Sequence, residues 1–177
     1  MTYLCQIPSP VGQLYAASDG ENIVGLWIEG QKYFESNLSE ETEAKELPVF
    51  QQLKDWLNIY FSGSNPDFLP PLAPQGSAFR QSVWQILLSI PYGELTTYGA
   101  IAKQMEAQSE GKHVSAQAVG GAVGHNPISI VIPCHRVVGS TGSLTGYAGG
   151  IDKKIHLLKL EGVSMDHLFV PKKGTAL

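Results

Sequence analysis

Short apolar segments near the N-terminus have the length and residue types of β-strands. They span residues 1–7, 13–17 and 23–28, and the last two are joined by residues 19–22 (DGEN), a run typical of a hairpin turn. Large apolar residues then recur at spacings of three and four over residues 48–63, beginning at a proline that suits a first helical position. We therefore predict a small antiparallel sheet covered by one amphipathic helix.

A proline-rich segment separates this region from the rest of the chain. Residues 63–76 contain four prolines, and proline ends helices and cannot donate a backbone hydrogen bond to a sheet. We interpret the segment as a linker, so that residues 1–75 form an N-terminal domain and residues 77–170 form a C-terminal domain.

Three helical patterns follow the linker. Residues 79–90 carry apolar side chains at helical spacing, and a second helix begins after a capping threonine, Thr96 or Thr97. Residues 115–124 predict a third helix, capped by Ser115, in which six of ten residues are glycine or alanine. Glycine costs up to about 1 kcal/mol relative to alanine inside a helix. We therefore expect that another surface approaches the backbone of this thin helix closely. A helix-turn-helix that meets another large surface and tight packing inside the domain explain it equally well.

A reactive cysteine is the next candidate feature. The apolar run at residues 128–132 ends at Pro133 and leads into Cys134 and His135. A lone cysteine is usually a small buried hydrophobe, but a nucleophilic thiol needs a base or a positive field to ionise, and a nearby histidine is the usual base. Adjacent residues on an extended strand point to opposite faces, so we expect a water molecule to bridge Cys134 and His135. A cysteine hydrolase is a competing interpretation of the same pair.

The last part of the chain combines a glycine-rich loop with a final helix. Residues 139–150 include five glycines and no charged residue, which predicts a loop able to pass close to a bound ring. Asp152 is expected to cap the helix that follows, and helical spacing places Glu161 on its apolar face. A buried carboxylate needs a partner, and His135 as that partner would give a Cys-His-Glu array. The alternative is an ordinary glutamate in water at the end of a helix.

Charge is distributed unevenly along the chain. The net charge is −4. Residues 1–78 hold three lysines against ten acidic residues, a net −7, whereas residues 79–177 hold nine basic residues against six acidic ones, a net +3. Any phosphate-binding surface is therefore expected in the second part.

The cysteines and the length of the apolar segments narrow the class of protein. Cys5 and Cys134 are too far apart for a C-x-x-C pair, so we expect free thiols and no bound metal. No stretch reaches the roughly 18 apolar residues needed to span a membrane, and the N-terminus lacks the pattern of a secretory signal. We expect a cytoplasmic protein without a membrane partner.

Several motifs resemble those of one protein family. The run NPISIVIPCHRVV is preceded by VW, IPYGELTTYGAIA and AVGGAVG and followed by GYAGG and LLKLEG. With these motifs the chain resembles the O6-alkylguanine-DNA alkyltransferases, also called methylated-DNA–protein-cysteine methyltransferases, closely over residues 79–165 and in general layout over residues 1–75. The resemblance implies an α+β fold in which an RNase H-like N-terminal domain precedes a winged-helix-like DNA-binding domain.

The resemblance also implies catalytic roles, residue by residue. Cys134 corresponds to the alkyl acceptor, His135 to the base that acts on it through a water molecule, and Glu161 to the residue that orients the histidine. Asn126 corresponds to the asparagine that braces the turn before the cysteine. Tyr98 corresponds to the tyrosine that donates to N3 of the departing guanine.

Binding residues are implied in the same way. The expected substrate-binding residues are Ser129, Val137, Tyr147 and Ala148. The expected DNA-binding residues are Thr97, Ser115, Ala116, Gln117, Ala118, Gly120 and Gly121. Gln117 stands where the family often has an arginine that fills the space left by the base, so we expect weaker binding to undamaged DNA. Arg136 is expected to be structural and to tie the two domains together.

The function implied is DNA repair by direct reversal. An alkyl group moves from O6 of guanine in duplex DNA to Cys134 after the nucleotide has been flipped out of the helix, with O4-alkylthymine as a second candidate substrate. The transfer is irreversible and needs no cofactor, and each protein, expected to be a monomer, acts once. A non-catalytic protein of the same fold that only binds alkylguanine is the alternative, and Cys134 argues against it.

Overall fold

The chain forms two compact units. The computed structural model describes residues 1–31 and 41–171. The first unit contains residues 1–75 together with the short segment 127–129, and the second contains the rest of the described chain. Each unit has its own β-sheet.

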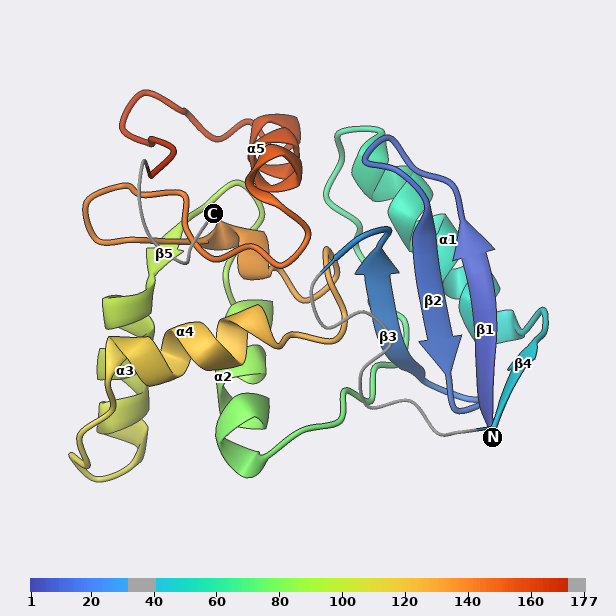
Figure 1. The fold of residues 1–177 in the computed structure, drawn as a ribbon, viewed down its shortest axis with the longest axis horizontal. Coiled ribbons are helices and arrows are strands. Elements are labelled where there is room, and N and C mark those ends of the chain that lie inside the picture. The colour runs from blue at the N-terminus through green and yellow to red at the C-terminus, as the bar shows by residue number, and fades with distance from the viewer. Residues whose placement is uncertain (32–40, 172–177) are drawn as a thin grey trace. The chain divides into compact units, whose positions relative to one another are not determined.

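A four-stranded sheet organises the first unit. Its strands are β1 (Thr2–Ile7), β2 (Leu14–Ser18), β3 (Ile23–Ile28) and β4 (Thr42–Ala44), in the spatial order β3-β2-β1-β4. The helix α1 (Pro48–Phe61) lies against one face of this sheet, as Figure 1 shows. It begins at the predicted proline, because a proline in the first helical turn removes no intrahelical hydrogen bond.

The sheet is mixed, and the prediction of a purely antiparallel sheet is wrong at one edge. β1 pairs antiparallel with β2, and β2 with β3, but β4 pairs parallel with β1 from Thr2–Thr42 to Leu4–Ala44. All three residues of β4 are exposed. The strand therefore lacks the alternation of buried and exposed side chains that reveals a strand in a sequence, and only backbone pairing places it in the sheet.

A segment from much later in the chain completes the first unit. The amide of Leu26 on β3 donates to the carbonyl of Pro127 at 2.8 Å, and the amide of Ser129 donates to the carbonyl of Leu26 at 2.9 Å. Ile128, between them, is fully buried. The residues that precede the candidate cysteine in sequence are thus fixed by main-chain hydrogen bonds to β3.

The second unit consists mainly of helices. They are α2 (Ala78–Leu88), α3 (Tyr98–Gln108), α4 (Ala116–Gly124) and α5 (Ile151–Leu160). A small parallel sheet pairs β5 (Thr96–Thr97) with β6 (Val137–Val138). No helix in the described parts of the chain is long and apolar enough to cross a membrane.

Side-chain caps begin three of these helices. Ser77, Thr97 and Ser115 each accept a hydrogen bond from a backbone amide in the first turn of the helix that follows. The cap predicted at Ser115 is therefore present, and of the two threonines predicted as alternatives, Thr97 is the cap. The cap predicted at Asp152 is wrong, because α5 begins after Gly150, whose φ of 103° suits glycine, and Asp152 lies inside the first turn.

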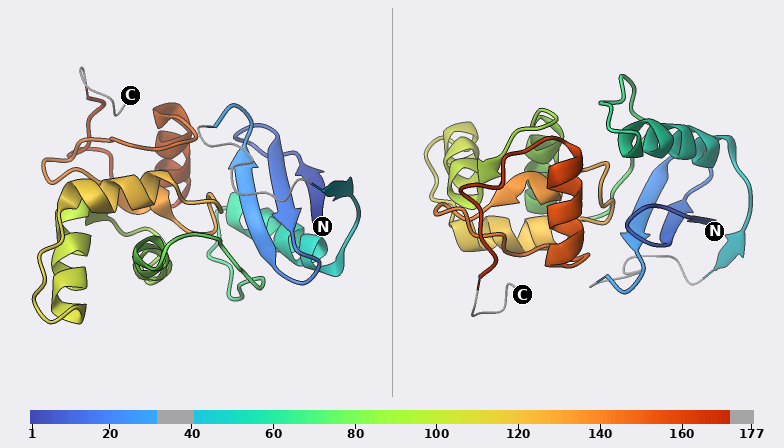
Figure 2. Two further views of the ribbon diagram at one scale, coloured as in Figure 1. Left: turned by 60° about the horizontal axis from the view of Figure 1, so that its bottom comes forward. Right: turned by 90° about the horizontal axis from the view of Figure 1, so that it is seen from above.

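The glycine-rich helix α4 packs against both α2 and α3 (Figure 2). The indole Nε1 of Trp84 on α2 donates to the carbonyl of Ala122 on α4 at 2.9 Å. A Cβ atom built at Gly121 or Gly124 would meet nothing within 4 Å. Packing inside the unit therefore explains the buried face of α4, but it does not require glycine at these two positions.

Candidate active site

Cys134 lies on a tight turn, and the prediction of an extended strand at this point is wrong. Cys134–Arg136 form one turn of 3-10 helix between Pro133 and β6, and the amide of Arg136 donates to the carbonyl of Pro133 at 3.0 Å. Proline favours a turn here because it has no amide to donate to a sheet. Consequently the argument that Cys134 and His135 point to opposite faces of a strand does not apply. Cys134 is buried, with 5% of its surface exposed.

The carboxylate of Glu161 connects three segments of the second unit. Its Oε2 lies 2.6 Å from Nε2 of His135. Its Oε1 accepts hydrogen bonds from Nε of Arg136 at 2.8 Å and from the amide of Gly93 at 2.9 Å. The side chains of His135 and Glu161 are both completely buried, and charge-assisted hydrogen bonds are strong in such surroundings. The structure therefore brings together the histidine and the glutamate that the sequence analysis singled out.

These contacts determine the protonation of both side chains. Burial by itself would raise the pKa of Glu161, but the hydrogen bonds and charges of His135 and Arg136 outweigh burial and lower the pKa to about 2. Burial lowers the pKa of His135, and the attraction of Glu161 offsets this only in part. At neutral pH the imidazole is therefore uncharged, with Nε2–H donating to Glu161. This tautomer leaves Nδ1 able to accept a proton.

The thiol of Cys134 is protonated at rest. Burial raises its pKa, and the hydrogen bond from the side chain of Asn126 and the charge of Lys154 offset this only in part. Asn126 also donates from Nδ2 to the carbonyl of Ile132 at 2.8 Å, so it braces the turn that leads to the cysteine. Because the thiolate is the nucleophilic form, removal of the thiol proton is a step that the site itself must perform.

Arg136 joins segments within the second unit. Its Nη1 donates to the carbonyl of Ile90 at 2.7 Å, its Nε donates to Glu161, and its guanidinium lies 5.7 Å from the ring centre of Tyr92. All of these partners belong to the second unit. These contacts give Arg136 a local role, because its charge neutralises the buried Glu161. The expectation that it ties the two domains together stays a prediction.

The glycine-rich loop at residues 139–150 meets the site through two tyrosines. The ring of Tyr147 packs edge-to-face against His135, with ring centres 6.4 Å apart. The hydroxyl of Tyr98 donates to the carbonyl of Thr145 at 2.9 Å. Gly146 permits this approach, because its φ is +77° and a Cβ atom there would lie 2.9 Å from the Tyr98 hydroxyl.

Lys154 on α5 is a site residue that the sequence analysis missed. It is completely buried, and its ammonium group donates to the carbonyls of Val137 and Thr145. Burial lowers its pKa to about 8, and the nearby Cys134 opposes this change, so the group is charged at neutral pH. A signal was available, because Lys154 stands three residues after Ile151 and four before Leu158 and so shares the apolar stripe of the helix.

The remaining predicted site residues lie in several parts of the fold. Val137 is buried in β6, and Ala148 is half-buried in the glycine-rich loop. Ser129 belongs to the first unit, where its hydroxyl donates to Oε1 of Gln31 at 3.1 Å. Of the predicted DNA-binding residues, Thr97 caps α3 and is half-buried, and Gly120 on α4 is half-buried. The others lie at the start of α4 or along it and are exposed: Ser115, Ala116, Gln117, Ala118 and Gly121.

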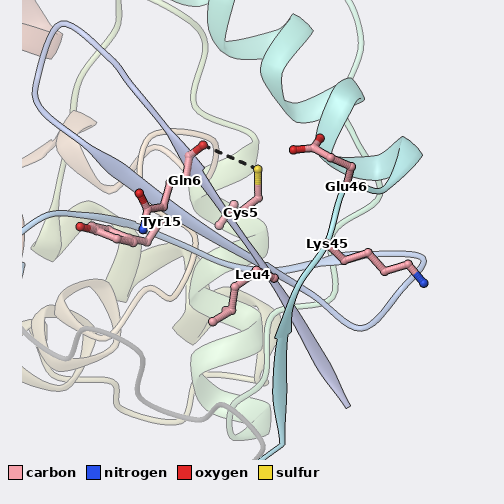
Figure 3. Close-up of a pocket in the computed structure, with 8 residues that line it drawn as sticks. Leu4, Cys5, Gln6, Tyr15, Lys45 and Glu46 are labelled. Carbon is pink, nitrogen blue, oxygen red and sulfur yellow. Dashed lines mark hydrogen bonds between the residues drawn. The ribbon is translucent and has the colours of Figure 1, made fainter.

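The other cysteine lies in the first unit, beside a cavity of about 510 Å³. Figure 3 shows Cys5 on β1 among the residues that line this cavity, including Tyr15, Lys45 and Glu46. Burial raises the pKa of Cys5, and the charge of Lys54 offsets this increase only in part. None of the described residues that line the cavity is a histidine, so Cys5 lacks the base found beside Cys134. In the described parts of the chain, no group of three histidine, cysteine or acidic side chains is placed to hold a metal ion.

Two sequence profiles of one family match this chain. Residues 2–74 match the ribonuclease-like domain of 6-O-methylguanine DNA methyltransferase, and residues 78–163 match its DNA binding domain. The chain belongs to the 6-O-methylguanine DNA methyltransferase family. Cys134, His135 and Glu161 all lie within the segment that matches the DNA binding domain.

Relatives in the 6-O-methylguanine DNA methyltransferase family match nearly the whole chain. The methylated-DNA–protein-cysteine methyltransferase of Haemophilus influenzae is 44% identical over 162 residues, which are 91% of this chain and 87% of the relative. That of Methanosarcina acetivorans is 41% identical over 161 residues, 90% of this chain and 98% of the relative. The crystal structure of Mycobacterium tuberculosis OGT in complex with DNA matches with a TM-score of 0.78 at 42% identity, covering 90% of this chain and 92% of that chain.

These similarities establish the class of the protein. It is an enzyme of direct-reversal DNA repair with the two-domain α+β fold of the 6-O-methylguanine DNA methyltransferases. The predictions of the family, the fold class and the methyltransferase activity are confirmed.

Proposed function

We propose that this protein transfers an alkyl group from O6 of guanine in double-stranded DNA to the sulfur of Cys134. The observation that carries the proposal is the buried array in which Glu161 holds Nε2 of His135 at 2.6 Å, one residue after the cysteine. A neutral imidazole held in this way keeps a nitrogen that can accept a proton, and the residue before it is a thiol that must lose one, which are the components of an activated nucleophile.

The reaction balances without a cofactor. A water molecule carries the thiol proton of Cys134 to Nδ1 of His135, and Glu161 stabilises the imidazolium that forms. The thiolate attacks the alkyl carbon in line, the bond between that carbon and O6 breaks, and its electron pair leaves with the guanine. The base needs one proton to become guanine, and the thiol has released one. Burial raises the pKa of Tyr98, so its hydroxyl remains a donor that can stabilise the departing base at N3.

Helix α4 supplies the surface that we propose meets the DNA. Its outer face exposes small or uncharged side chains, namely Ser115, Ala116, Gln117, Ala118 and Gly121. Such a face lets the backbone of a helix approach a groove closely. The target O6 lies inside the base stack, so the nucleotide must be rotated out before Cys134 can reach it. Gln117 is the side chain we propose to occupy the space that the base leaves.

We further propose that each molecule acts once, as a monomer. The product at Cys134 is a thioether, and the neighbouring groups are His135, Asn126, Tyr98 and Lys154, none of which can displace sulfur from an alkyl carbon. Turnover therefore stops when the sulfur is consumed. A cysteine hydrolase would differ, because it would regenerate its thiol with every cycle.

Intact mass measurement tests this function directly. The protein is incubated under reducing conditions with a duplex that contains one O6-methylguanine, and the modified peptide is then identified. We expect a stoichiometric gain of one methyl group on Cys134, no gain in Cys134→Ala, and an unchanged gain in Cys5→Ala. A wild-type protein that binds the duplex but stays unmodified would support the lesion-binding alternative and overturn the proposal. Product in excess of protein would instead indicate a hydrolase.

A further inference from the structure

Lys154 is a buried cation that has no role in the reaction proposed above. Its side chain lies in the interior of the second unit with no exposed surface. None of the ion pairs among the described residues involves Lys154, and its ammonium hydrogen bonds run to the carbonyls of Val137 and Thr145. A buried charge stabilised only by carbonyl oxygens is costly for the fold, which favours a role in the chemistry.

Two donors converge on a single acceptor, the carbonyl oxygen of Thr145. The hydroxyl of Tyr98 lies 2.9 Å from it, and Nζ of Lys154 lies 2.8 Å from it. A carbonyl oxygen has two lone pairs and can accept both bonds. In the proposed reaction the Tyr98 hydroxyl must turn towards N3 of the bound guanine, so it has to leave Thr145. The carbonyl then keeps one donor only if Lys154 remains in place.

We propose that Lys154 is a positioning residue for the transfer: it holds the carbonyls of Thr145 and Val137 while the Tyr98 hydroxyl moves to the base, and it places a positive charge near the sulfur of Cys134. This inference rests on the proposed function. A partly buried carbonyl that loses its last protein donor is destabilised, so without Lys154 the Tyr98 hydroxyl would be retained by the loop instead of donating to the base.

The charge of Lys154 has a separate consequence at the sulfur. Apart from the uncharged His135, the groups near Cys134 are three: the Asn126 amide two residues after α4, the Tyr98 hydroxyl from α3 and Lys154 from α5. Of these three only Lys154 carries a positive charge, and its attraction lowers the pKa of Cys134 against the effect of burial. The charges of Glu161 and Arg136 beside His135 pair with each other. Lys154 therefore favours the thiolate at neutral pH.

A double-mutant cycle tests the exchange of donors at Thr145. Single-turnover rates of methyl transfer are measured for wild type, Tyr98→Phe, Lys154→Met and the double variant, with the adjacent Lys153→Met as control, since Lys153 pairs with Asp152 at 3.3 Å outside the site. We expect Tyr98→Phe to slow transfer roughly tenfold in the wild-type background. In the Lys154→Met background the same change should have little effect, because the hydroxyl is already held by the loop. An equal loss in both backgrounds would overturn the inference.

If a thermal melt shows that Lys154→Met is unfolded, Lys154→Gln is used for the test instead. Its amide keeps two N–H donors but has no charge, so Tyr98→Phe should again cost about tenfold in this background. At neutral pH Lys154→Gln should transfer roughly tenfold more slowly than wild type and approach the wild-type rate at alkaline pH, where the thiol ionises unaided. A wild-type rate at neutral pH, or a deficit independent of pH, would refute the electrostatic role. Failure of the wild-type protein to accept the methyl group would instead refute the proposed function.

Discussion

Replacing Glu161 with glutamine removes one charge and keeps the shape of the side chain. In the wild-type protein this carboxylate accepts hydrogen bonds from His135, Arg136 and the amide of Gly93. A glutamine can accept at one atom only, and its NH₂ group would face a donor. Glu161→Gln therefore leaves the guanidinium of Arg136 buried without a counter-charge, and it removes the acceptor that holds the tautomer of His135.

The pKa of Glu161 gives the size of the expected loss in stability. The pKa falls from an ordinary 4.5 to about 2 in the folded protein, which corresponds to about 3 kcal/mol of net favourable interaction with the ionised form. Breaking a buried ion pair by removal of one partner commonly costs 3–5 kcal/mol, so the two approaches agree at roughly 3 kcal/mol. We expect Glu161→Gln to lower the free energy of unfolding by this amount at neutral pH. We also expect it to slow methyl transfer, because His135 loses its orientation.

The same pKa predicts how the loss of stability in Glu161→Gln depends on pH. Because the pKa of Glu161 is lower in the folded protein than in the unfolded chain, its contribution to stability is complete above about pH 4.5 and disappears as the pH falls towards about 2. The difference in stability between wild type and Glu161→Gln should therefore shrink over this range. At neutral pH it should be constant.

Urea denaturation measured at several pH values provides the assay. Asp152→Asn is the matched control, because Asp152 lies on α5, the helix that ends just before Glu161, is largely exposed, and among the described residues forms an ion pair with Lys153 alone. We expect the control to change stability by less than about 0.5 kcal/mol. Equal urea midpoints for wild type and Glu161→Gln at neutral pH would refute the reasoning. A difference that did not shrink in acid would show that the loss comes from packing and not from charge.

Other predictions concern the packing of α4, its exposed face and the glycine-rich loop. Trp84→Phe removes the hydrogen bond to the carbonyl of Ala122 and should lower the free energy of unfolding by about 2 kcal/mol; an unchanged urea midpoint would contradict this. Gln117→Arg, at an exposed position on α4, should bind duplex DNA more tightly and with a steeper salt dependence, measured by fluorescence anisotropy. An unaltered salt dependence would contradict the proposed contact between residue 117 and DNA. Gly146→Ala places a methyl group 2.9 Å from the Tyr98 hydroxyl at a φ of +77°. It should lower stability by about 1 kcal/mol and slow transfer several-fold, and a wild-type rate would show that the loop does not position Tyr98.

Hydrophobic spacing predicted most of the secondary structure. The stripes of apolar residues placed α1 to α5 and the strands β1 to β3 close to where the structure has them. Residue type identified Ser115 as a cap and narrowed the cap of α3 to Thr96 or Thr97. β4 was missed because an exposed three-residue strand has no buried face to leave a pattern. The turn at Cys134 was missed because an apolar run followed by proline suits either a strand or a turn, and the packing around it decides between them.

The candidate site was predictable where helical spacing shows which face is buried. Glu161 was identified because a carboxylate on an apolar face requires a partner, and His135 was the available one. Lys154 lies on the same stripe of α5 and was overlooked, since its partners are carbonyl oxygens that any residue carries. The pairing of Arg136 with Glu161 was missed for a related reason. A sequence shows that a charge is present but does not show which buried group it neutralises.

The sequence alone determined the chemical groups and the face of each element that is buried, because local spacing and residue type control both. Only the tertiary structure decided which polar atoms meet. The amide of Gly93 and the carboxylate of Glu161 are 68 residues apart in sequence and lie 2.9 Å apart in the fold. Contacts of this kind depend on how several helices and loops pack together at once, and they control the protonation of His135 and Cys134. The reactivity of the cysteine is therefore a property of the folded unit, although the cysteine itself can be recognised in the sequence.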